Sequence, residues 1–426
     1  MKTITLPWSK SITNRDLILA SLNNWITKLS SILVSDDTKF MIKALKKLWI
    51  KIEDNWENLT IFGWVWKINW DDKEIFIWQS WTCIRFLTWL WVLNNKWTIT
   101  LFWDERLNKR PIKDLIEWIK QMWIKIESNN GFPPVKIFSW KIINNKIKMN
   151  WTISSQFFTA LLNIWWFINW WLEIEVIWDL VSKPYIDMTI FELKKFWIKV
   201  ENKNYEKFIV YEKEKLENNK NLIVEWDASA LSYIANFVVL NSWKIRINNI
   251  WKNTKQWDYK YLEILQKIFW LDFESDWETT ILRSNWIKEI INWFENLEVN
   301  FENMPDVSMS FMSLAIFLAW KTKITWLKTL NLKESKRIDA MKNELEKLWV
   351  EVKSDDESIT IWEFSFEKYK DIIKNWKIDI ETYNDHRIAM VFWVLDTFIW
   401  NLNILNPSCV AKTYPNFWED LKILQN

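Results

Sequence analysis

One pattern of hydrophobic and polar positions recurs along this chain: an amphipathic helical run, a single junction residue and an alternating strand. In the first copy Ser35 is a candidate N-cap, and hydrophobic residues recur at helical spacing from Phe40 to Leu48. Apolar and polar residues then alternate over 50–53, as in a half-buried strand. The junctions of five such copies read LWIKIE, MWIKIE, FWIKVE, FWLDFE and LWVEVK. The pattern predicts repeated units that mix helices and strands.

The spacing of the junctions predicts how many units there are. The junction residues are Trp49, Trp123, Trp197, Trp270 and Trp349, which lie 74, 74, 73 and 79 residues apart. A sixth unit would end near the helix-like run NFWEDLKILQ, so the 426 residues divide into six units of roughly 71 residues. Because a single hydrophobic core rarely grows beyond ~250–300 residues, we expect two domains of three units each.

The junction residue follows a helix at the position where the chain commonly turns left-handed, and glycine is usual there. Any other residue costs roughly 1–2 kcal/mol in that conformation. The chain has 39 Trp and 2 Gly, which together come close to the ordinary glycine share of about 7%. We therefore hypothesise that most Trp positions are glycines, encoded by UGA codons that some bacterial lineages read as glycine. The alternative is a Trp-rich surface for membranes or carbohydrates, which does not explain why Trp recurs at helix ends.

Charge and cysteine content exclude several classes of protein. The net charge is +2, with 56 basic and 54 acidic residues spread along the chain, so no nucleic-acid-binding arm is expected. Cys83 and Cys409 give neither a disulfide framework nor a metal-ligand cluster. The N-terminal residues lack the apolar core of a signal peptide. The run FFTALLNIWWFINWWL falls short of a membrane span once its Trp are read as Gly, and predicts a buried helix followed by a turn. These features predict a cytoplasmic protein.

Three segments of the first quarter carry groups suited to anions. LPWSKSITNR is a basic, Ser-rich turn that enters a helix and carries Lys10 and Arg15; a solvated strand end is the alternative. IWQSWTCIRFLTWL becomes a Gly-x-x-Gly-Thr turn if Trp78 and Trp81 are glycines, which would let backbone N–H groups approach a phosphate. DERLNKRPI places Arg110 for bidentate capture of a carboxylate or phosphate. The alternative is a surface Arg cluster that binds no ligand.

Two further segments offer neutral hydrogen-bonding groups. In WTISSQFFTALL, the hydroxyls of Ser154 and Ser155 suit a phosphate, and Gln156 suits a polyol ring. In DLVSKPYIDMT, Ser182 and Tyr185 offer the same two kinds of contact. Ser-rich turns are usually helix caps, which is the alternative interpretation.

The second half of the chain contains acids, cations and the single histidine in five separated segments. The segments read VEWDASALSYI, MPDVSMSFM, LKTLNLKESKRIDAM, TYNDHRIAM and CVAKTYPNFWEDL. A lone histidine is more often structural than catalytic, but this one lies between an Asp and an Arg. The chemically capable residues of these segments are Asp306, Lys333, Glu334, Arg337, His386, Arg387 and Lys412.

Read with glycine at Trp8, Trp78, Trp81 and Trp226, these motifs resemble, in order and over nearly the whole chain, those of the 5-enolpyruvylshikimate-3-phosphate synthases. The opening resembles LPGSKS-x-x-NR, and DLVSKPYID is similar almost letter for letter. Two departures stand out. Gln79 replaces an Asn of the family, and Lys336 replaces an Asp, which changes the local ion pairing.

The resemblance implies a two-domain inside-out α/β barrel built from six βαβαββ repeats. It implies one domain of residues 9–225, with the contacts to shikimate 3-phosphate, and a second of residues 1–8 plus 226–426. The active site is then expected in the cleft between the domains, which close around substrate.

The resemblance also implies transfer of the enolpyruvyl group of phosphoenolpyruvate to the 5-hydroxyl of shikimate 3-phosphate, with release of phosphate, in aromatic amino acid biosynthesis. No cofactor, metal, nucleic acid or membrane is expected, and the enzyme is expected to be a monomer. Asp306 and Glu334 are candidate bases, and Lys10, Glu334 or Lys412 would protonate the methylene carbon. The implied catalytic residues are Lys10, Asp306, Glu334, His386 and Lys412.

The resemblance assigns the remaining residues to the two substrates. The implied shikimate 3-phosphate contacts are Lys10, Ser11, Arg15, Ser154, Ser155, Gln156, Ser182, Tyr185, Asp306, Thr329 and Lys333. The implied phosphoenolpyruvate contacts are Lys10, Trp81, Thr82, Arg110, Gln156, Arg337, Arg387 and Lys412.

Two alternative functions are compatible with the same fold. One is the sister enzyme that transfers the group to UDP-N-acetylglucosamine, against which the segments DLVSKPYID and KES-x-R argue. The other is a noncatalytic paralogue that binds ligand. Against it stand the intact residues Lys10, Asp306, Glu334, His386 and Lys412.

Overall fold

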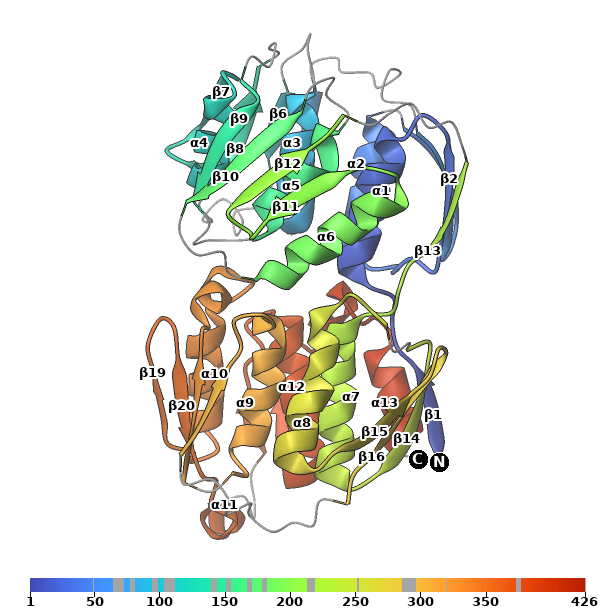
Figure 1. Ribbon diagram of the computed structural model, residues 1–426. Helices are drawn as coiled ribbons and strands as arrows, with labels where there is room; N and C mark the ends of the chain where they lie inside the picture. The colour runs from blue at the N-terminus through green and yellow to red at the C-terminus, as the bar shows by residue number, and fades with distance from the viewer. Residues whose placement is uncertain are drawn as a thin grey trace. The chain divides into compact units, whose positions relative to one another are not determined.

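The chain folds into two compact units (Figure 1). The N-terminal unit is Trp8–Glu225, and the C-terminal unit combines Met1–Pro7 with Trp226–Asn426. The N-terminal unit therefore begins at Trp8, one residue before the expected residue 9. The computed structural model describes residues 1–48, 50–63, 73–76, 81–93, 99–102, 112–138, 144–150, 155–166, 171–177, 182–212, 219–250, 253–285, 296–318, 320–372 and 377–425.

The N-terminal unit alternates helices and strands in the order that the junction pattern predicts. Its helices are α1 (Lys10–Leu22), α2 (Asp36–Lys47), α3 (Trp81–Val92), α4 (Lys113–Gln121), α5 (Ser155–Trp165) and α6 (Lys183–Lys195). Its strands are β2 (Ile26–Ser30), β3 (Lys51–Asn55), β4 (Asn58–Phe62), β5 (Lys73–Phe76), β6 (Ile99–Phe102), β7 (Ile126–Asn129), β8 (Phe132–Ile137), β9 (Lys146–Asn150), β10 (Leu172–Ile177), β11 (Val200–Lys203), β12 (Lys207–Val210) and β13 (Lys220–Ile223).

The C-terminal unit has the same mixture. Its helices are α7 (Ala228–Asn241), α8 (Tyr261–Phe269), α9 (Ser308–Ala315), α10 (Arg337–Glu346), α11 (Phe366–Ile372), α12 (His386–Ile399) and α13 (Phe417–Gln425), and its 3₁₀ turns include η3 (Trp257–Lys260), η4 (Pro305–Val307), η5 (Lys328–Leu332) and η7 (Pro407–Lys412). Its strands are β1 (Lys2–Thr5), β14 (Lys244–Asn248), β15 (Asp272–Ser275), β16 (Thr279–Arg283), β17 (Asn296–Asn300), β18 (Lys321–Thr325), β19 (Val352–Ser354), β20 (Ile359–Trp362), β21 (Ile378–Ile380) and β22 (Leu402–Ile404).

The strands pair by one scheme throughout the described ranges. Five sheets have four strands, in the orders β13-β2-β4-β3, β5-β6-β8-β7, β9-β10-β12-β11, β1-β14-β16-β15 and β17-β18-β20-β19, and β21 pairs with β22 alone. In each four-stranded sheet the first pair is parallel and the other two pairs are antiparallel. A parallel pair requires a crossover connection, which α5 supplies between β9 and β10 and α9 supplies between β17 and β18.

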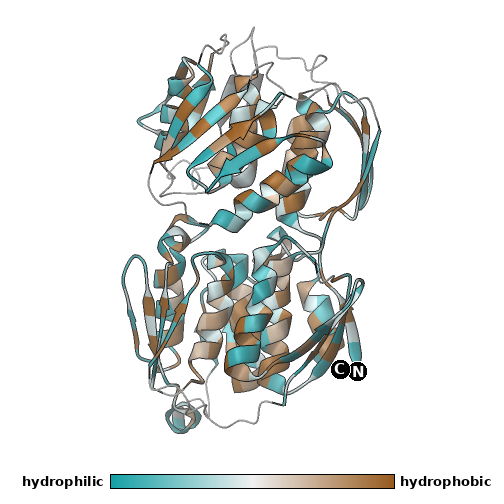
Figure 2. Ribbon diagram, viewed as in Figure 1, coloured by the Kyte–Doolittle hydropathy of each residue, from teal (hydrophilic) through white to brown (hydrophobic). Residues whose placement is uncertain are grey.

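Each unit has a core of buried helices with the sheets outside them (Figure 1). Twelve of the fourteen residues of α7 are buried, and a helix that is apolar on nearly all sides belongs in an interior. Along the strands, hydrophobic and polar residues alternate instead, as hydropathy colouring shows (Figure 2). In β14 the residues Ile245 and Ile247 are buried and their neighbours face outward. The predicted buried helix in the Trp-rich run is confirmed as α5, and its predicted turn lies outside the described residues.

The junction residues turn left-handed as expected. Trp123, Trp197, Trp270 and Trp349 have φ angles of 65°, 62°, 50° and 57°, and all four side chains are exposed. Trp49 lies outside the described residues.

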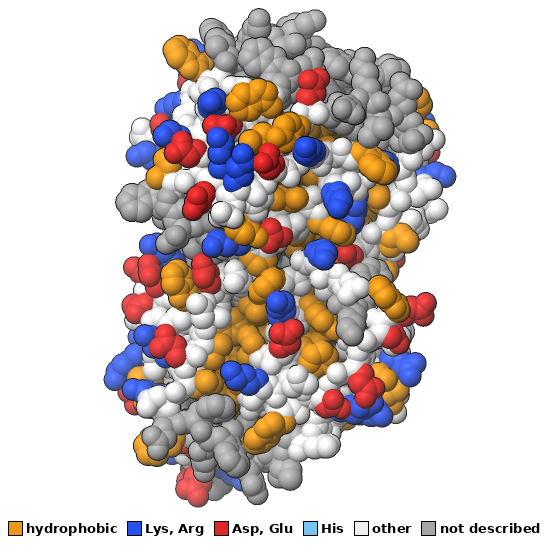
Figure 3. Space-filling view, viewed as in Figure 1, with side chains coloured by type: hydrophobic (Ala, Val, Ile, Leu, Met, Phe, Trp, Pro, Cys, Tyr) orange, Lys and Arg blue, Asp and Glu red, His pale blue; other side chains and the backbone are white. Residues whose placement is uncertain are grey.

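Lys and Arg side chains are interspersed with Asp and Glu on the face shown in Figure 3. This mixture fits a net charge of only +2. Of the helices that the structure describes, none is both long and apolar enough to cross a membrane.

Two carboxyl groups are buried where α1 packs against α6. Asp16 and Glu192 are both 0% exposed, and the Lys195 ammonium lies 2.7 Å from a Glu192 carboxylate oxygen. Burial raises the pKa of Asp16 well above its usual range, and the neighbouring Glu192 raises it further. Burial also raises the pKa of Glu192. The pair therefore holds a proton that the unfolded chain releases.

We predict that this pair makes stability fall as pH rises. Below about pH 4 both states are protonated. Above it the unfolded state loses protons that the folded state keeps, so the free energy of unfolding decreases until the raised folded pKa is passed. Asp16→Asn should flatten this dependence by up to about 1.4 kcal/mol per pH unit, measured by urea unfolding between pH 5 and 7. The exposed Asp54→Asn is the control, and an unchanged slope in Asp16→Asn would contradict the assignment.

Candidate active site

A buried guanidinium binds three carboxylates in the C-terminal unit. Arg337, the first residue of α10, is 1% exposed. Its Nε donates to Asp385 Oδ2, its Nη1 to Asp306 Oδ1 and its Nη2 to Glu334 Oε2, each at 2.8 Å. Burial opposes the charge on Arg337, but the three carboxylates outweigh it and raise its pKa above the usual value. Arg337 is therefore a permanent cation that draws three acids together.

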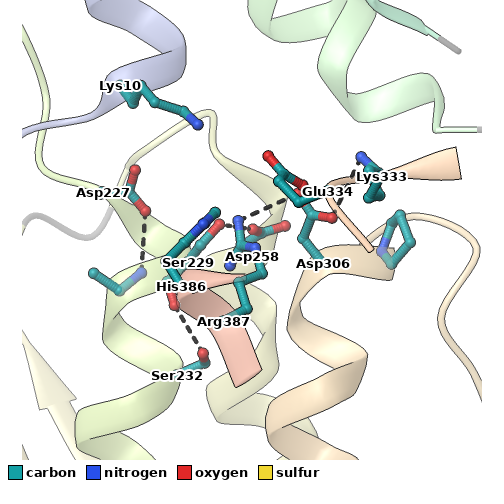
Figure 4. A network of polar contacts seen from close by, with 12 residues as sticks. Lys10, Asp227, Ser229, Ser232, Asp258, Asp306, Lys333, Glu334, His386 and Arg387 are labelled. Atoms are coloured by element: carbon teal, nitrogen blue, oxygen red, sulfur yellow. Dashed lines mark hydrogen bonds and ion pairs between the residues drawn. The ribbon is translucent and has the colours of Figure 1, made fainter. Parts of the chain in front are cut away.

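Three more cations surround these acids. Arg387 Nη2 lies 3.2 Å from Asp306 Oδ2, and Lys333 Nζ lies 3.3 Å from Asp306 Oδ1 (Figure 4). Lys412 Nζ lies 3.0 Å from Glu334 Oε1. The result is a network in which Asp306 and Glu334 each bridge Arg337 and a more accessible cation.

The cations control the ionisation of the central acid. Burial alone raises the pKa of Asp306, but Lys333, Arg387 and Arg337 outweigh it and hold that pKa well below its usual value. Burial likewise opposes the charge on Asp385, and Arg337 lowers its pKa in spite of it. Asp306 is therefore a fully ionised carboxylate, surrounded by positive charge.

Helix starts position the network. Asp306 follows Pro305 in η4, where the fixed φ of proline suits the first position of a turn. Asp385 is the N-cap of α12, and its Oδ1 accepts from the Arg387 backbone N–H at 3.0 Å. One carboxylate thus caps the helix that carries Arg387 and binds Arg337 as well.

The departure at Lys336 is compensated within the described structure. Lys336 occupies the N-cap of α10 but makes no side-chain cap bond, and its side chain is 77% exposed. Asn331 Oδ1 accepts from the Ile338 backbone N–H at 3.1 Å instead. A residue of η5 therefore satisfies a backbone donor that a capping Asp ordinarily takes.

The remaining predicted residues of this unit lie close to the network. His386 is 1% exposed, with Nδ1 3.8 Å from Asp385 Oδ1. Thr329 belongs to η5, the turn that leads to Lys333. Within the described ranges no group of His, Cys, Asp and Glu is arranged as metal ligands.

Several residues of the network were not predicted from the sequence. Asp385 and Tyr233 lie inside segments of interest, and the Tyr233 hydroxyl accepts from Arg387 Nη1 at 3.1 Å. Ser335 donates to Asp385 at 3.0 Å. Asp258 of η3 bonds the Ser229 hydroxyl, and burial raises the pKa of Asp258 to about 7 (Figure 4). No motif marked Asp258, because only folding brings η3 beside α7.

In the N-terminal unit, Arg15 ties three helices together. It is buried, and its Nε donates to Thr189 at 3.0 Å. Its two terminal nitrogens donate to the carbonyl of Ser11 at 2.7 Å, and to Thr159 and the carbonyl of Tyr185, both at 3.4 Å. The structure gives Arg15 a role in linking α1, α5 and α6, and its predicted contact with substrate stays a prediction.

The N-terminal halves of these three helices therefore meet at Arg15. Lys10 begins α1 and lies 3.2 Å from Asp37. Gln156, in the first turn of α5, accepts from Arg85 of α3. Ser182 is the N-cap of α6, with a φ of 59° and no side-chain cap bond. Helix N-termini attract anions, so this end of the bundle is suited to a phosphate.

Some predicted residues cannot be placed. Arg110 and Ser154 lie outside the described residues, as do the side chains of Ser155 and Trp81. Thr82 follows Trp81 in the first turn of α3 and is partly buried.

Comparisons with known proteins agree with this architecture. The solved EPSP synthase of Acinetobacter baumannii superposes with a TM-score of 0.77 at 19% identity, covering 99% of this chain and 94% of that one. The enolpyruvyl transferase NikO of Streptomyces tendae superposes with a TM-score of 0.73 at 11% identity, covering 100% and 95%. These likenesses show the fold, a mixed α/β fold shared with enolpyruvyl transferases.

Sequence comparison identifies the family. The chain is 33% identical to a 3-phosphoshikimate 1-carboxyvinyltransferase of Haemophilus influenzae (strain PittEE), over 99% of this chain and 95% of that protein. It is 32% identical to the protein of that name from Haemophilus ducreyi, with the same coverage. Residues 1–421 match the family model of EPSP synthase (3-phosphoshikimate 1-carboxyvinyltransferase), and the chain belongs to that family.

Proposed function

We propose that the network around Arg337 is the part of the active site with which this chain transfers the enolpyruvyl group of phosphoenolpyruvate to the 5-hydroxyl of shikimate 3-phosphate. The observation that carries the proposal is the arrangement of Asp306 and Glu334, each held between buried Arg337 and a more accessible cation. The reaction moves protons and binds two anionic substrates, and this network supplies acids and cations together.

Asp306 is the proposed base for the hydroxyl proton. A carboxylate with a strongly lowered pKa is a weak base, since the best catalytic pKa lies near the working pH. The same cations that lower it, Lys333 and Arg387, are those proposed to bind substrate anions. When substrate takes up their charge, their effect on Asp306 weakens and its basicity rises. Binding of both substrates would thereby activate the base.

Glu334 and Lys412 are proposed to handle the second proton, which goes to the methylene carbon of phosphoenolpyruvate. The pair is 3.0 Å apart, so a proton can be exchanged within it. Arg337 on the other side of Glu334 stabilises negative charge as it develops. Lys10 remains the other proposed donor.

The N-terminal unit is proposed to bind shikimate 3-phosphate. Its support is the meeting of the N-terminal halves of α1, α5 and α6 at Arg15, with Lys10 and Gln156 in the first turns of α1 and α5. Ser182 adds a hydroxyl without a cap bond, on a left-handed residue. Strained residues of this kind cluster at ligand sites. Ser11, Ser154, Ser155 and Tyr185 complete the proposed contacts. Monomeric state and cytoplasmic location stay predictions.

We further propose that the six sheets are six copies of one βαβαββ unit. The support is the common strand order, with one parallel pair and two antiparallel pairs, in the five four-stranded sheets of the described structure. The sixth copy retains the parallel pair β21–β22, joined through α12.

We also propose that most Trp positions are glycines in the functional protein. Among the residues that the structure describes, eight Trp have positive φ and exposed side chains: Trp56, Trp123, Trp197, Trp270, Trp320, Trp326, Trp349 and Trp400. Bulky residues are outliers there, at roughly 1–2 kcal/mol each, so eight would cost as much as the whole ~5–15 kcal/mol stability of a domain. Buried Trp89, Trp91, Trp165 and Trp226 have indole N–H groups without acceptors, which is a second cost.

We predict that glycine at the eight positive-φ positions stabilises the chain by roughly 1 kcal/mol per site, measured by urea unfolding. A matched chain with Ala at the same positions separates conformation from bulk. Ala removes the indole but keeps the Cβ, so it should gain little. If Ala stabilises as much as Gly, the backbone argument is wrong. Peptide masses from the native source should show glycine at these positions.

The glycine-restored chain is the chain with glycine at the Trp positions proposed above to be glycine. In it, we predict that Asp306→Asn and Glu334→Gln lower kcat by about 10²–10⁴-fold. The KM values should change far less, because the cations remain and lose a competing carboxylate. Steady-state phosphate release checks this. Exposed Asp339→Asn is the control, from the same helix as Arg337. A rise in KM with kcat unchanged would assign both acids to binding rather than proton transfer.

We predict that Arg387→Lys raises the KM for phosphoenolpyruvate by roughly tenfold or more. Lysine keeps the charge but loses the planar fork, and a hydrogen bond to a charged group is worth about 1.5–3 kcal/mol. The KM for shikimate 3-phosphate should change little. Equal effects on both substrates would refute the assignment of Arg387 to phosphoenolpyruvate.

A further inference from the structure

Glu344 is a buried acid outside the network described above. It lies near the end of α10 and is 0% exposed. Its Oε2 accepts from the Glu381 backbone N–H at 3.0 Å and from Lys347 Nζ at 2.6 Å. Its Oε1 accepts from the Tyr383 hydroxyl at 2.8 Å. Two of its three partners belong to the segment that precedes α12.

That segment is a turn in an unfavourable conformation. The Asp385 N–H donates to the Thr382 carbonyl at 2.8 Å, and the two residues between them, Tyr383 and Asn384, have φ angles of 53° and 55°. Two positive φ angles are the pattern of a type I′ turn, which favours Asn-Gly. A bulky Tyr at the first position is disfavoured, so contacts elsewhere must hold the turn. The bond from Tyr383 to Glu344 is such a contact.

The turn sets where α12 begins. Asp385 is both its last residue and the N-cap of α12, and Arg387 lies two residues further on. Any rotation of the turn therefore moves the Asp385 carboxylate away from Arg337, and the Arg387 guanidinium away from Asp306.

Helix α10 holds this segment at two points. Arg337, Met341 and Glu344 follow the four- and three-residue spacing of one helix face, and all three are buried. Arg337 and Glu344 are two turns apart, about 10 Å along the axis. The first binds Asp385, and the second binds the backbone of Glu381 and the side chain of Tyr383.

We propose that Glu344 is a positioning residue for the proposed reaction: it holds the 382–385 turn left-handed and so fixes Arg387 and Asp385 against Asp306 and Arg337. The inference rests on the proposed function, because its readout is the binding of phosphoenolpyruvate by Arg387. Glu344 itself makes no contact with the network, and acts only through the turn.

The test is the steady-state kinetics of Glu344→Gln and Tyr383→Phe in the glycine-restored chain. Glu344→Gln keeps an acceptor oxygen but loses the charge, and Tyr383→Phe removes only the hydroxyl. Both should raise the KM for phosphoenolpyruvate by about tenfold, as loss of one charge-assisted bond does, and leave the KM for shikimate 3-phosphate within about twofold. Lys347→Met is the matched control, since it removes the third partner of Glu344 and a bond to the Asp379 carbonyl but no bond to residues 382–385.

Asn384→Gly supplies a rescue. Glycine at the second central position favours the type I′ turn by itself, so it should restore the phosphoenolpyruvate KM when added to Glu344→Gln. A purely structural Glu344 would lower the melting temperature without separating the two KM values, and that result overturns the inference. If Glu344→Gln does not fold, Tyr383→Phe decides alone. Absence of phosphate release from the folded glycine-restored chain without further substitutions would instead count against the proposed function.

Discussion

The structure of the candidate site depends on one buried cation. Arg337 is surrounded by carboxylates from three separate segments, and it is 1% exposed, so bulk solvent screens its charge little. Removing one partner of a buried ion pair typically costs 3–5 kcal/mol, because the other charge is left uncompensated. Asp306, Glu334 and Asp385 are therefore bound to one another through Arg337. This also fixes the positions of the turn η4 and of the starts of α10 and α12, because the acids lie on or beside these elements.

This constraint explains how the site combines affinity with reactivity. Arg337 holds the three acids close together, while Lys333, Arg387 and Lys412 lie on the other sides of Asp306 and Glu334. In the proposed reaction, substrates that carry phosphate and carboxylate groups would compete with the acids for these outer cations and leave Arg337 in place. Asp306 would then keep its position and gain basicity as substrate binds. Glu344 adds a second anchor, which keeps α12 aligned with α10.

Much of the fold and part of the candidate site could be predicted from the sequence, because the signals for them lie in short contiguous segments. The helix-to-strand junctions follow from periodicity and from the left-handed position after a helix, which Trp123 and Trp197 confirm. The segment motifs located Asp306, Glu334 and Arg337 because contiguous residues carry them. Contacts between distant segments were beyond reach. Arg15 joins three helices, Asp258 approaches the network only through folding, and Glu344 meets a segment some forty residues later. Single buried acids of this kind have no signature in a linear pattern.

The central claim is that Arg337 sets the ionisation of the acids around it. The most direct test is the titration of the Asp306 carboxyl carbon by NMR, in the glycine-restored chain and in its Arg337→Gln variant. With Arg337 present, Asp306 should stay ionised below pH 3, under the ordinary aspartate pKa of about 3.9. The variant lacks one of the three cations that oppose the effect of burial on Asp306. The pKa of Asp306 should therefore rise by at least about one unit. An Asp306 that titrates at its ordinary pKa in both proteins would contradict the account.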